Sequence, residues 1–171
     1  MVGTQCRILY QDAMGRMNIA LKFNEMVRNG EIGPVMLGRD HHDTGGTDSP
    51  FRETSNIKDG SNIMAEMATQ CYAGNAARGM SYIALHNGGG TGIGRAINGG
   101  FGMVIDGSED SARHIKEMLL WDVNNGIARR SWARNEGAMS AIRREMERTP
   151  GLQVTMPNLA DEELIRKALN E

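Results

Sequence analysis

The sequence lacks most features that mark nucleic-acid-binding, secreted or membrane proteins. Its formal net charge of −2 and pI near 6.1 offer no basic surface for nucleic acid or an anionic membrane. Aromatic residues make up only 5% of the 171 residues, which disfavours stacking platforms for bases. No apolar run approaches the ~20 residues of a membrane span, and the N-terminus has no signal-peptide pattern. We therefore expect neither nucleic acid nor membrane as a partner.

Cysteine and proline are also scarce. Cys6 and Cys71 lie far apart and form no CxxC motif, so we expect two free thiols and a reducing, cytoplasmic location. The chain has only four prolines, and no Pro/Ser-rich linker or internal repeat divides it. Its length suffices for one substantial core. We predict a single compact α/β domain over residues 1–171, with a small, mainly parallel sheet flanked by helices.

Apolar periodicity and helix caps predict the order of the elements. Apolar side chains at three-to-four spacing, followed by Gly30, predict a helix over residues 11–29. Ser108, followed by two acidic residues, predicts the start of another helix. We expect strands at 34–37, 80–85 and 101–105, an edge strand at 152–156, and further helices from residue 59, within 124–148 and from Asp161.

The segment Gly38–Thr54 is the most informative part of the chain. It places adjacent histidines, six acidic or basic residues and several glycines directly after a predicted strand. Such a mixture supplies acids, bases and cations within reach of one point, as proton transfer requires. Ligands of open α/β sheets usually bind at strand ends. The alternative is a surface loop whose charges pair with one another.

A glycine-rich segment, His86–Gly94, follows another predicted strand. Glycines let backbone N–H groups approach an anion closely. Arg95 occupies the position where a Rossmann GxGxxG motif needs its last glycine, and Arg95-Ala96 replaces the Lys-Ser/Thr of a P-loop. The segment therefore predicts either a tight turn or close approach to a ligand. Adjacent His41 and His42 point to opposite sides of an extended chain, so we expect no metal site.

Read together, these segments resemble the urocanase family. The resemblance rests on six segments in family order: KFNEMVRNGE (Lys22–Glu31), GRDHHDTGGTDSPFRET (Gly38–Thr54), KDGSNIMAEM (Lys58–Met67), ALHNGGGTGIG (Ala84–Gly94), NGGFGMVIDG (Asn98–Gly107) and WDVNNGIARR (Trp121–Arg130). They cover nearly the whole chain, and the HHD and NGGF motifs are closer to those of the animal-type branch. A set this long is more specific than any single motif.

The resemblance implies a hydro-lyase of histidine degradation that converts urocanate and water to imidazolonepropionate. In the family, tightly bound NAD⁺ acts as an electrophile: the imidazole ring attacks the nicotinamide, water adds, and the cofactor leaves unreduced. The chain looks like the C-terminal core portion only, with the NAD-binding domain and N-terminal segment upstream of it. The resemblance further implies a homodimer for the full-length enzyme and no activity for this portion alone.

The resemblance carries over to individual residues at two positions. Thr44 stands where many bacterial members have the active-site cysteine, and threonine cannot offer a thiolate. Gly126 matches a family glycine that contacts NAD⁺ through its backbone. Without the resemblance, Gly126 would indicate a turn at a helix start. The change at Thr44 also raises the alternative of a stand-alone, non-catalytic ligand-binding or interaction module.

The chemistry of urocanate suggests further candidates. An arginine fork matches its carboxylate, and a carboxylate or neutral histidine could orient its ring and move the proton of the added water. The substrate-binding candidates are Arg7, Arg39, Arg52 and His86. The catalytic candidates are Asp40, His41, Asp43 and Thr44. The cofactor-binding candidates are Gly126 and the pocket-floor glycines Gly88, Gly89 and Gly90. A metal-dependent hydrolase that uses His41, His42 and the aspartates is the weakest alternative.

Overall fold

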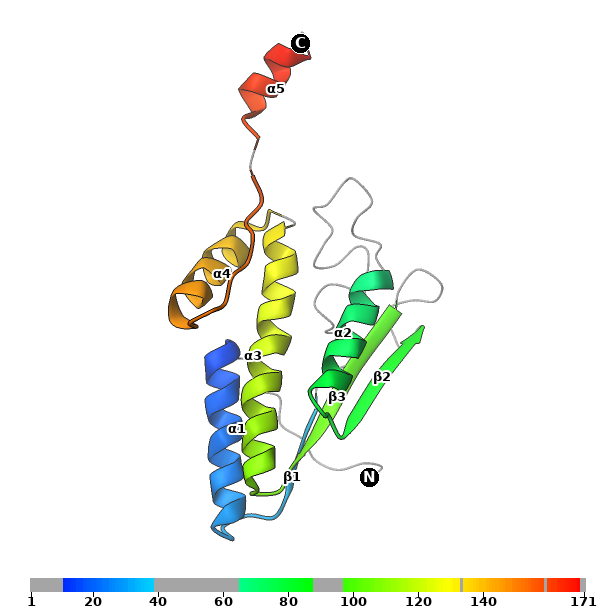
Figure 1. Ribbon diagram of the computed structural model, residues 1–171, viewed down its shortest axis with the longest axis vertical. Helices are drawn as coiled ribbons and strands as arrows, with labels where there is room; N and C mark the ends of the chain where they lie inside the picture. Colours follow the sequence, from blue (N-terminus) through cyan, green and yellow to red (C-terminus); the bar gives the residue numbers. More distant parts are fainter. Residues whose placement is uncertain (1–10, 39–64, 88–96, 133, 159, 170–171) are drawn as a thin grey trace, which may run out of the picture.

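The computed structural model describes residues 11–38, 65–87, 97–132, 134–158 and 160–169. In these ranges the chain forms a mixed α/β fold (Figure 1), which confirms the predicted class. The elements are α1 (Ala13–Arg28), β1 (Val35–Gly38), α2 (Ala65–Ala77), β2 (Tyr82–Asn87), β3 (Ile97–Ile105), α3 (Glu109–Trp132), α4 (Glu136–Arg148) and α5 (Glu162–Ala168).

The three strands form a sheet in the order β1-β3-β2. We predicted a mainly parallel sheet, and this prediction is wrong, because β3 pairs antiparallel with both neighbours. Residues 88–96 are the whole connection between β2 and β3. That connection is too short for the crossover of a dozen or more residues that parallel neighbours need. β1 and β2 lie on either side of β3 and run in the same direction.

One face of the sheet carries the core. Alternate residues of β3 (Phe101, Met103 and Ile105) are buried against α1 and against Ile115, Met118 and Leu119 of α3. α2 also contacts β2 and β3, and its Gly74 lies against the Trp121 ring of α3. The helices therefore cover the same face that the odd-numbered residues of β3 occupy, as alternation along a strand requires.

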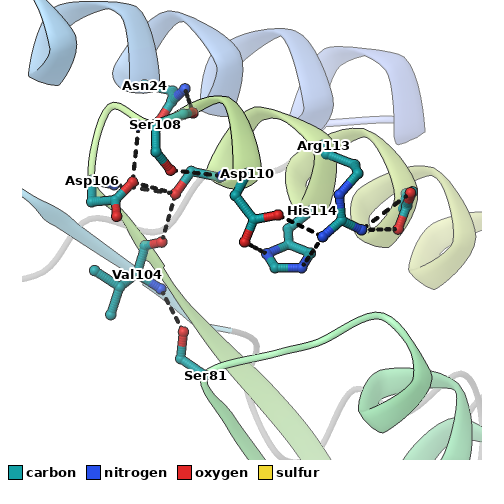
Figure 2. A network of polar contacts seen from close by, with 10 residues as sticks. Asn24, Ser81, Val104, Asp106, Ser108, Asp110, Arg113 and His114 are labelled. Atoms are coloured by element: carbon teal, nitrogen blue, oxygen red, sulfur yellow. Dashed lines mark hydrogen bonds and ion pairs between the residues drawn. The ribbon is translucent and has the colours of Figure 1, made fainter.

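A polar network joins the end of β3 to α1 and the start of α3 (Figure 2). The Asn24 amide accepts a hydrogen bond from the Gly107 N–H (2.9 Å) and donates one to the Ser108 carbonyl (3.0 Å). The Arg28 Nε donates to the Gly107 carbonyl at 2.8 Å. The Ser108 hydroxyl accepts from the Ser111 N–H at 3.0 Å, so it caps α3 as predicted. The network fixes where α3 begins.

The long helical region from residue 109 to residue 148 is divided at a different place from the one that the sequence predicted. We expected a helix from Ser108 and a second stretch within 124–148, but α3 runs unbroken from Glu109 to Trp132. The break lies before α4, where Arg134 has a positive φ of 61° and the Asn135 side chain accepts from the Ala138 N–H. Even α3 is not apolar enough to cross a membrane, and neither is any other described helix.

The C-terminal region departs from the compact part of the chain. The predicted edge strand at 152–156 is absent: that segment is not in a strand, and its Val154 N–H donates to the Met146 sulfur at 3.2 Å. A turn with Gly151 at φ +84° precedes it. Asp161 caps α5 as predicted by accepting from the Glu163 and Leu164 N–H groups. α5 has no buried residue and is set apart in Figure 1.

Candidate functional site

Most predicted site residues lie outside the described ranges. These are the catalytic candidates Asp40, His41, Asp43 and Thr44, the substrate-binding candidates Arg7, Arg39 and Arg52, and the pocket-floor candidates Gly88, Gly89 and Gly90. His86 lies within β2, where its backbone pairs with Asn98 of β3. Gly126 lies within α3 and is buried. The structure therefore describes the strands that precede Gly38–Thr54 and His86–Gly94, and the helix that contains Gly126.

The two loops leave the sheet in the same direction. β1 ends at Gly38 and β2 ends at Asn87, and both strands run antiparallel to β3. Gly38 and Tyr82 pair with the same residue, Gly102, so β2 extends further along the sheet from Tyr82 to Asn87. At ~3.4 Å per residue this offset is about 17 Å. The segments Gly38–Thr54 and His86–Gly94 thus both follow strands that point toward the same end of the sheet.

Gly126 occupies an unexpected position. A helix-start turn was its ordinary interpretation, but α3 begins at Glu109, so Gly126 lies deep inside a helix. Glycine inside a helix costs ~1 kcal/mol relative to alanine. A glycine kept at a buried helical position is typical of close approach by another backbone or a ligand.

Beside Gly126, α3 contacts α2 through polar side chains. The Asn125 amide and the Arg129 guanidinium donate to the Cys71 sulfur at 3.4 and 3.2 Å. Arg129 also donates to the Asn125 oxygen (3.0 Å) and to Gln70 (3.3 Å). We call these residues the α2–α3 polar contact: Gln70, Cys71, Asn125 and Arg129. Sequence reasoning missed this contact, although the four-residue spacing of Asn125 and Arg129 predicts that they share a helix face.

Two further asparagines of the same helices are buried without complete hydrogen bonding. Asn75 is 3% exposed and lies one turn after Cys71, and Asn124 is 7% exposed and lies two residues before Gly126. The Oδ1 atoms of both have no hydrogen-bond partner among the residues that the structure describes. An unsatisfied buried acceptor costs ~1–3 kcal/mol. Both oxygens therefore favour an additional hydrogen-bond donor from outside these residues.

Near the C-terminal end of α2, the contact with α3 is a cation–π interaction instead of a set of hydrogen bonds. The Arg78 guanidinium lies 4.3 Å from the centre of the Trp121 ring, a cation–π arrangement. Burial lowers the pKa of Arg78, and Glu117 acts against that shift. A hollow of about 360 Å³ lies here, with Ala77, Arg78 and Glu117 in its lining. In the described ranges, no three His, Cys, Asp or Glu side chains are grouped to hold a metal ion.

Comparison with known proteins identifies the family. The urocanase C-terminal domain model matches residues 1–144. A probable urocanate hydratase of Caenorhabditis elegans is 54% identical over 97% of this chain. The urocanate hydratases of Mus musculus and Homo sapiens are 52% and 51% identical over 98% of it.

The alignment with these relatives covers nearly all of this chain but only part of each relative. The chain spans 25% of the length of each of the three relatives. Their animal origin agrees with the predicted likeness to the animal-type branch. The family match and the identities extend through the sheet and through α3 with Gly126. The chain therefore belongs to the urocanase C-terminal domain family.

Proposed function

We propose that this chain is the C-terminal core portion of a urocanate hydratase, a cytoplasmic hydro-lyase that adds water to urocanate to give imidazolonepropionate. The observation that carries the proposal is the identity of at least 51% to urocanate hydratases across 97–98% of the chain. Because the chain matches only a quarter of those relatives, we propose that it is inactive alone. The complete enzyme, with an upstream NAD-binding domain, works as a homodimer.

In the proposed site, the charged loop handles the substrate. Arg39, Arg52 or Arg7 binds the urocanate carboxylate by a bidentate contact. Asp40, Asp43 or His41 orients the imidazole ring and moves the proton of the added water. The common direction in which β1 and β2 leave the sheet supports placing this loop beside the glycine segment. His86, at the end of β2, is proposed to contact the substrate.

NAD⁺ is the proposed cofactor, and its proposed place is beside Gly126 of α3. When bound, NAD⁺ supplies an electrophilic nicotinamide ring. Because glycine has no side chain, Gly126 would let the cofactor approach the α3 backbone closely, and Gly88, Gly89 and Gly90 would expose backbone N–H groups to it. The unpartnered Asn124 Oδ1 can accept a hydrogen bond from an amide or amino group. These residues hold the cofactor, while the loop residues bind and orient urocanate.

A chimera tests the proposal. In mouse urocanate hydratase the matched quarter is replaced by this chain, and loss of urocanate's ultraviolet absorbance is followed with NAD⁺ present. We expect the chimera to consume urocanate and the isolated chain to leave it unchanged. Asp43→Asn should lower kcat about 100-fold or more if Asp43 moves the proton. The matched control Asp12→Asn alters a carboxylate that caps α1 and should retain activity.

The alternative is a stand-alone, non-catalytic module, which is favoured by the threonine at position 44. A folded chimera that contains NAD⁺ and leaves the absorbance unchanged would support this alternative. Thr44→Cys in the same chimera separates the two cases. Activity that appears only with cysteine shows that the threonine disabled the site.

A further inference from the structure

The face of the sheet opposite the core carries three exposed apolar or aromatic side chains, and its Gly102 is buried beneath one of them. Met36 of β1, Tyr82 of β2 and Val104 of β3 are 62%, 49% and 47% exposed. The register pairs Met36 with Val104 and places Gly38, Gly102 and Tyr82 in one row, so these five residues share a face. We call them the open sheet face: Met36, Gly38, Tyr82, Gly102 and Val104.

This face does not have the pattern of a solvated sheet surface. Antiparallel sheets with one face in water alternate apolar and polar residues along each strand. On β3 and β1 the outward positions are instead Gly102, Val104, Met36 and Gly38. A Cβ on Gly102 would lie 2.5 Å from the Met36 terminal methyl group, so the Met36 side chain lies across the glycine. A sheet face without outward polar side chains is typical of packing against a second layer.

We infer that the open sheet face is a docking surface for the part of urocanate hydratase that lies outside the matched region. In each of the relatives, three quarters of the polypeptide lies outside the match. That polypeptide accompanies this sequence in animals as different as worm and human, so it can supply a covering layer. The identity of the partner rests on the proposed function, whereas the apolar character of the face does not.

The size of the face favours this partner over a second copy of the chain. The described part covers four residues of β1, four of β3 and one of β2, roughly 150 Å² at ~3.4 Å per residue and ~4.8 Å between strands. A stable complex of separate proteins needs ~800 Å² from each partner. Segments of one polypeptide need less contact, because their association costs far less translational and rotational freedom. The partner therefore presents a small apolar patch, such as one helix face rich in aliphatic side chains.

Hydroxyl-radical labelling tests the inference without relying on activity. The isolated chain and the mouse chimera are labelled, and side-chain oxidation is measured by mass spectrometry. We expect strong labelling of Met36 and Tyr82 in the isolated chain and loss of that labelling in the chimera. Trp132, which is 54% exposed at the end of α3, is the exposed reference. Met103 and Met118 are buried and report that the domain is folded in both samples.

Two variants sharpen the test. Met36→Asp places a charge on the open sheet face and should restore Tyr82 labelling in the chimera, because burying an unpaired carboxylate is strongly unfavourable. Asn18→Asp adds the same charge to an exposed position of α1, on the other side of the sheet, and should leave the protection intact. The same replacement in the human relative provides a second host in case the mouse chimera misfolds.

Two outcomes overturn the inference. Met36 labelling that is equal in the folded chimera and the isolated chain shows that the face stays exposed in the complete polypeptide. Protection of Met36 in the isolated chain, with sedimentation as a dimer, assigns the face to a second copy instead. A chimera that protects Met36 yet consumes no urocanate supports the docking surface and contradicts only the proposed activity.

Discussion

Asn24 and Asn124 are both buried asparagines on long helices, and their amides have opposite surroundings. Asn24 is 2% exposed, and its amide both accepts from the Gly107 N–H and donates to the Ser108 carbonyl. Asn124 is similarly buried, but its oxygen lacks a partner among the described residues. The first amide is satisfied within the polar network at the end of β3, whereas the oxygen of the second has no partner among the described residues. The two positions therefore differ in what their hydrogen bonds contribute to the stability of this domain.

The largest loss of stability should come from disrupting the polar network at Gly107. This residue has φ +86°, and an added Cβ would lie 2.8 Å from the Arg28 nitrogen and 2.9 Å from its Cα. Gly107→Ala should lower the free energy of unfolding by at least ~3 kcal/mol, because backbone strain and a clash with the α1 backbone act together. Urea denaturation followed by circular dichroism measures the loss.

Gly151→Ala is the matched control for this change. Gly151 has a nearly equal φ of +84°, but nothing lies within 4 Å of its added Cβ. Its substitution should cost only ~1–2 kcal/mol, the cost of a left-handed backbone alone. Equal losses in the two variants would show that the close approach of α1 to Gly107 contributes nothing.

The next effect compares the two asparagines directly. Asn24→Leu keeps a similar volume but leaves the Gly107 N–H and the Ser108 carbonyl without their partner, so it should cost ~2–4 kcal/mol. Asn124→Leu removes an acceptor that already lacks a partner, so it should change stability by less than ~1 kcal/mol. Thermal and urea unfolding of both variants measures the difference. A loss at Asn124 as large as that at Asn24 would mean that its amide is satisfied within the domain.

Local signals in the sequence predicted the elements well, and long-range contacts explain the errors. Asp12, Ser108 and Asp161 are caps, which depend on neighbours three residues away, and all three cap helices. The strand direction depends on the short connection between β2 and β3, which the apolar pattern within each strand does not reveal. The break near Arg134 has no proline, and the prediction of one stretch within 124–148 overlooked its local signal, the capping residue Asn135. Strand and helix contacts that are distant in sequence leave no such local mark.

The candidate site was less predictable than the fold. Gly126 was identified only through the family resemblance, since a glycine alone favours a turn. The burial of Asn124 depends on how α3 packs against other elements, which no periodicity specifies. The hydrophobic pattern of α3 beside α2 is weak because the contact there is polar. The exposed Met36 and Val104 looked like core residues in the sequence, because an apolar strand does not reveal whether a second layer is present.

The smallest predicted effect concerns the charge of the Asp106 carboxylate in the same polar network. The Asp106 carboxylate accepts from the Ser108 N–H at 2.9 Å and from the Ser111 hydroxyl at 2.7 Å. Hydrogen bonds from Ser108 and then Ser111 lower the pKa of Asp106 from 3.8 to about 2. Because the pKa is lower in the folded state, this contribution to stability is complete above pH ~4 and is lost as the pH falls toward 2.

Asp106→Asn and Ser111→Ala separate the charge from its donors. Asparagine keeps an acceptor oxygen but does not titrate, so the loss of stability between pH 4 and 2 should be shallower than in the parent chain. Ser111→Ala removes one donor and should raise the Asp106 pKa toward 3.8. Carbon-13 NMR of the carboxyl group follows the titration directly. If Asp106 titrated near 3.8 in the parent chain, the hydrogen bonds from Ser108 and Ser111 would not stabilise the charged form of its carboxyl group.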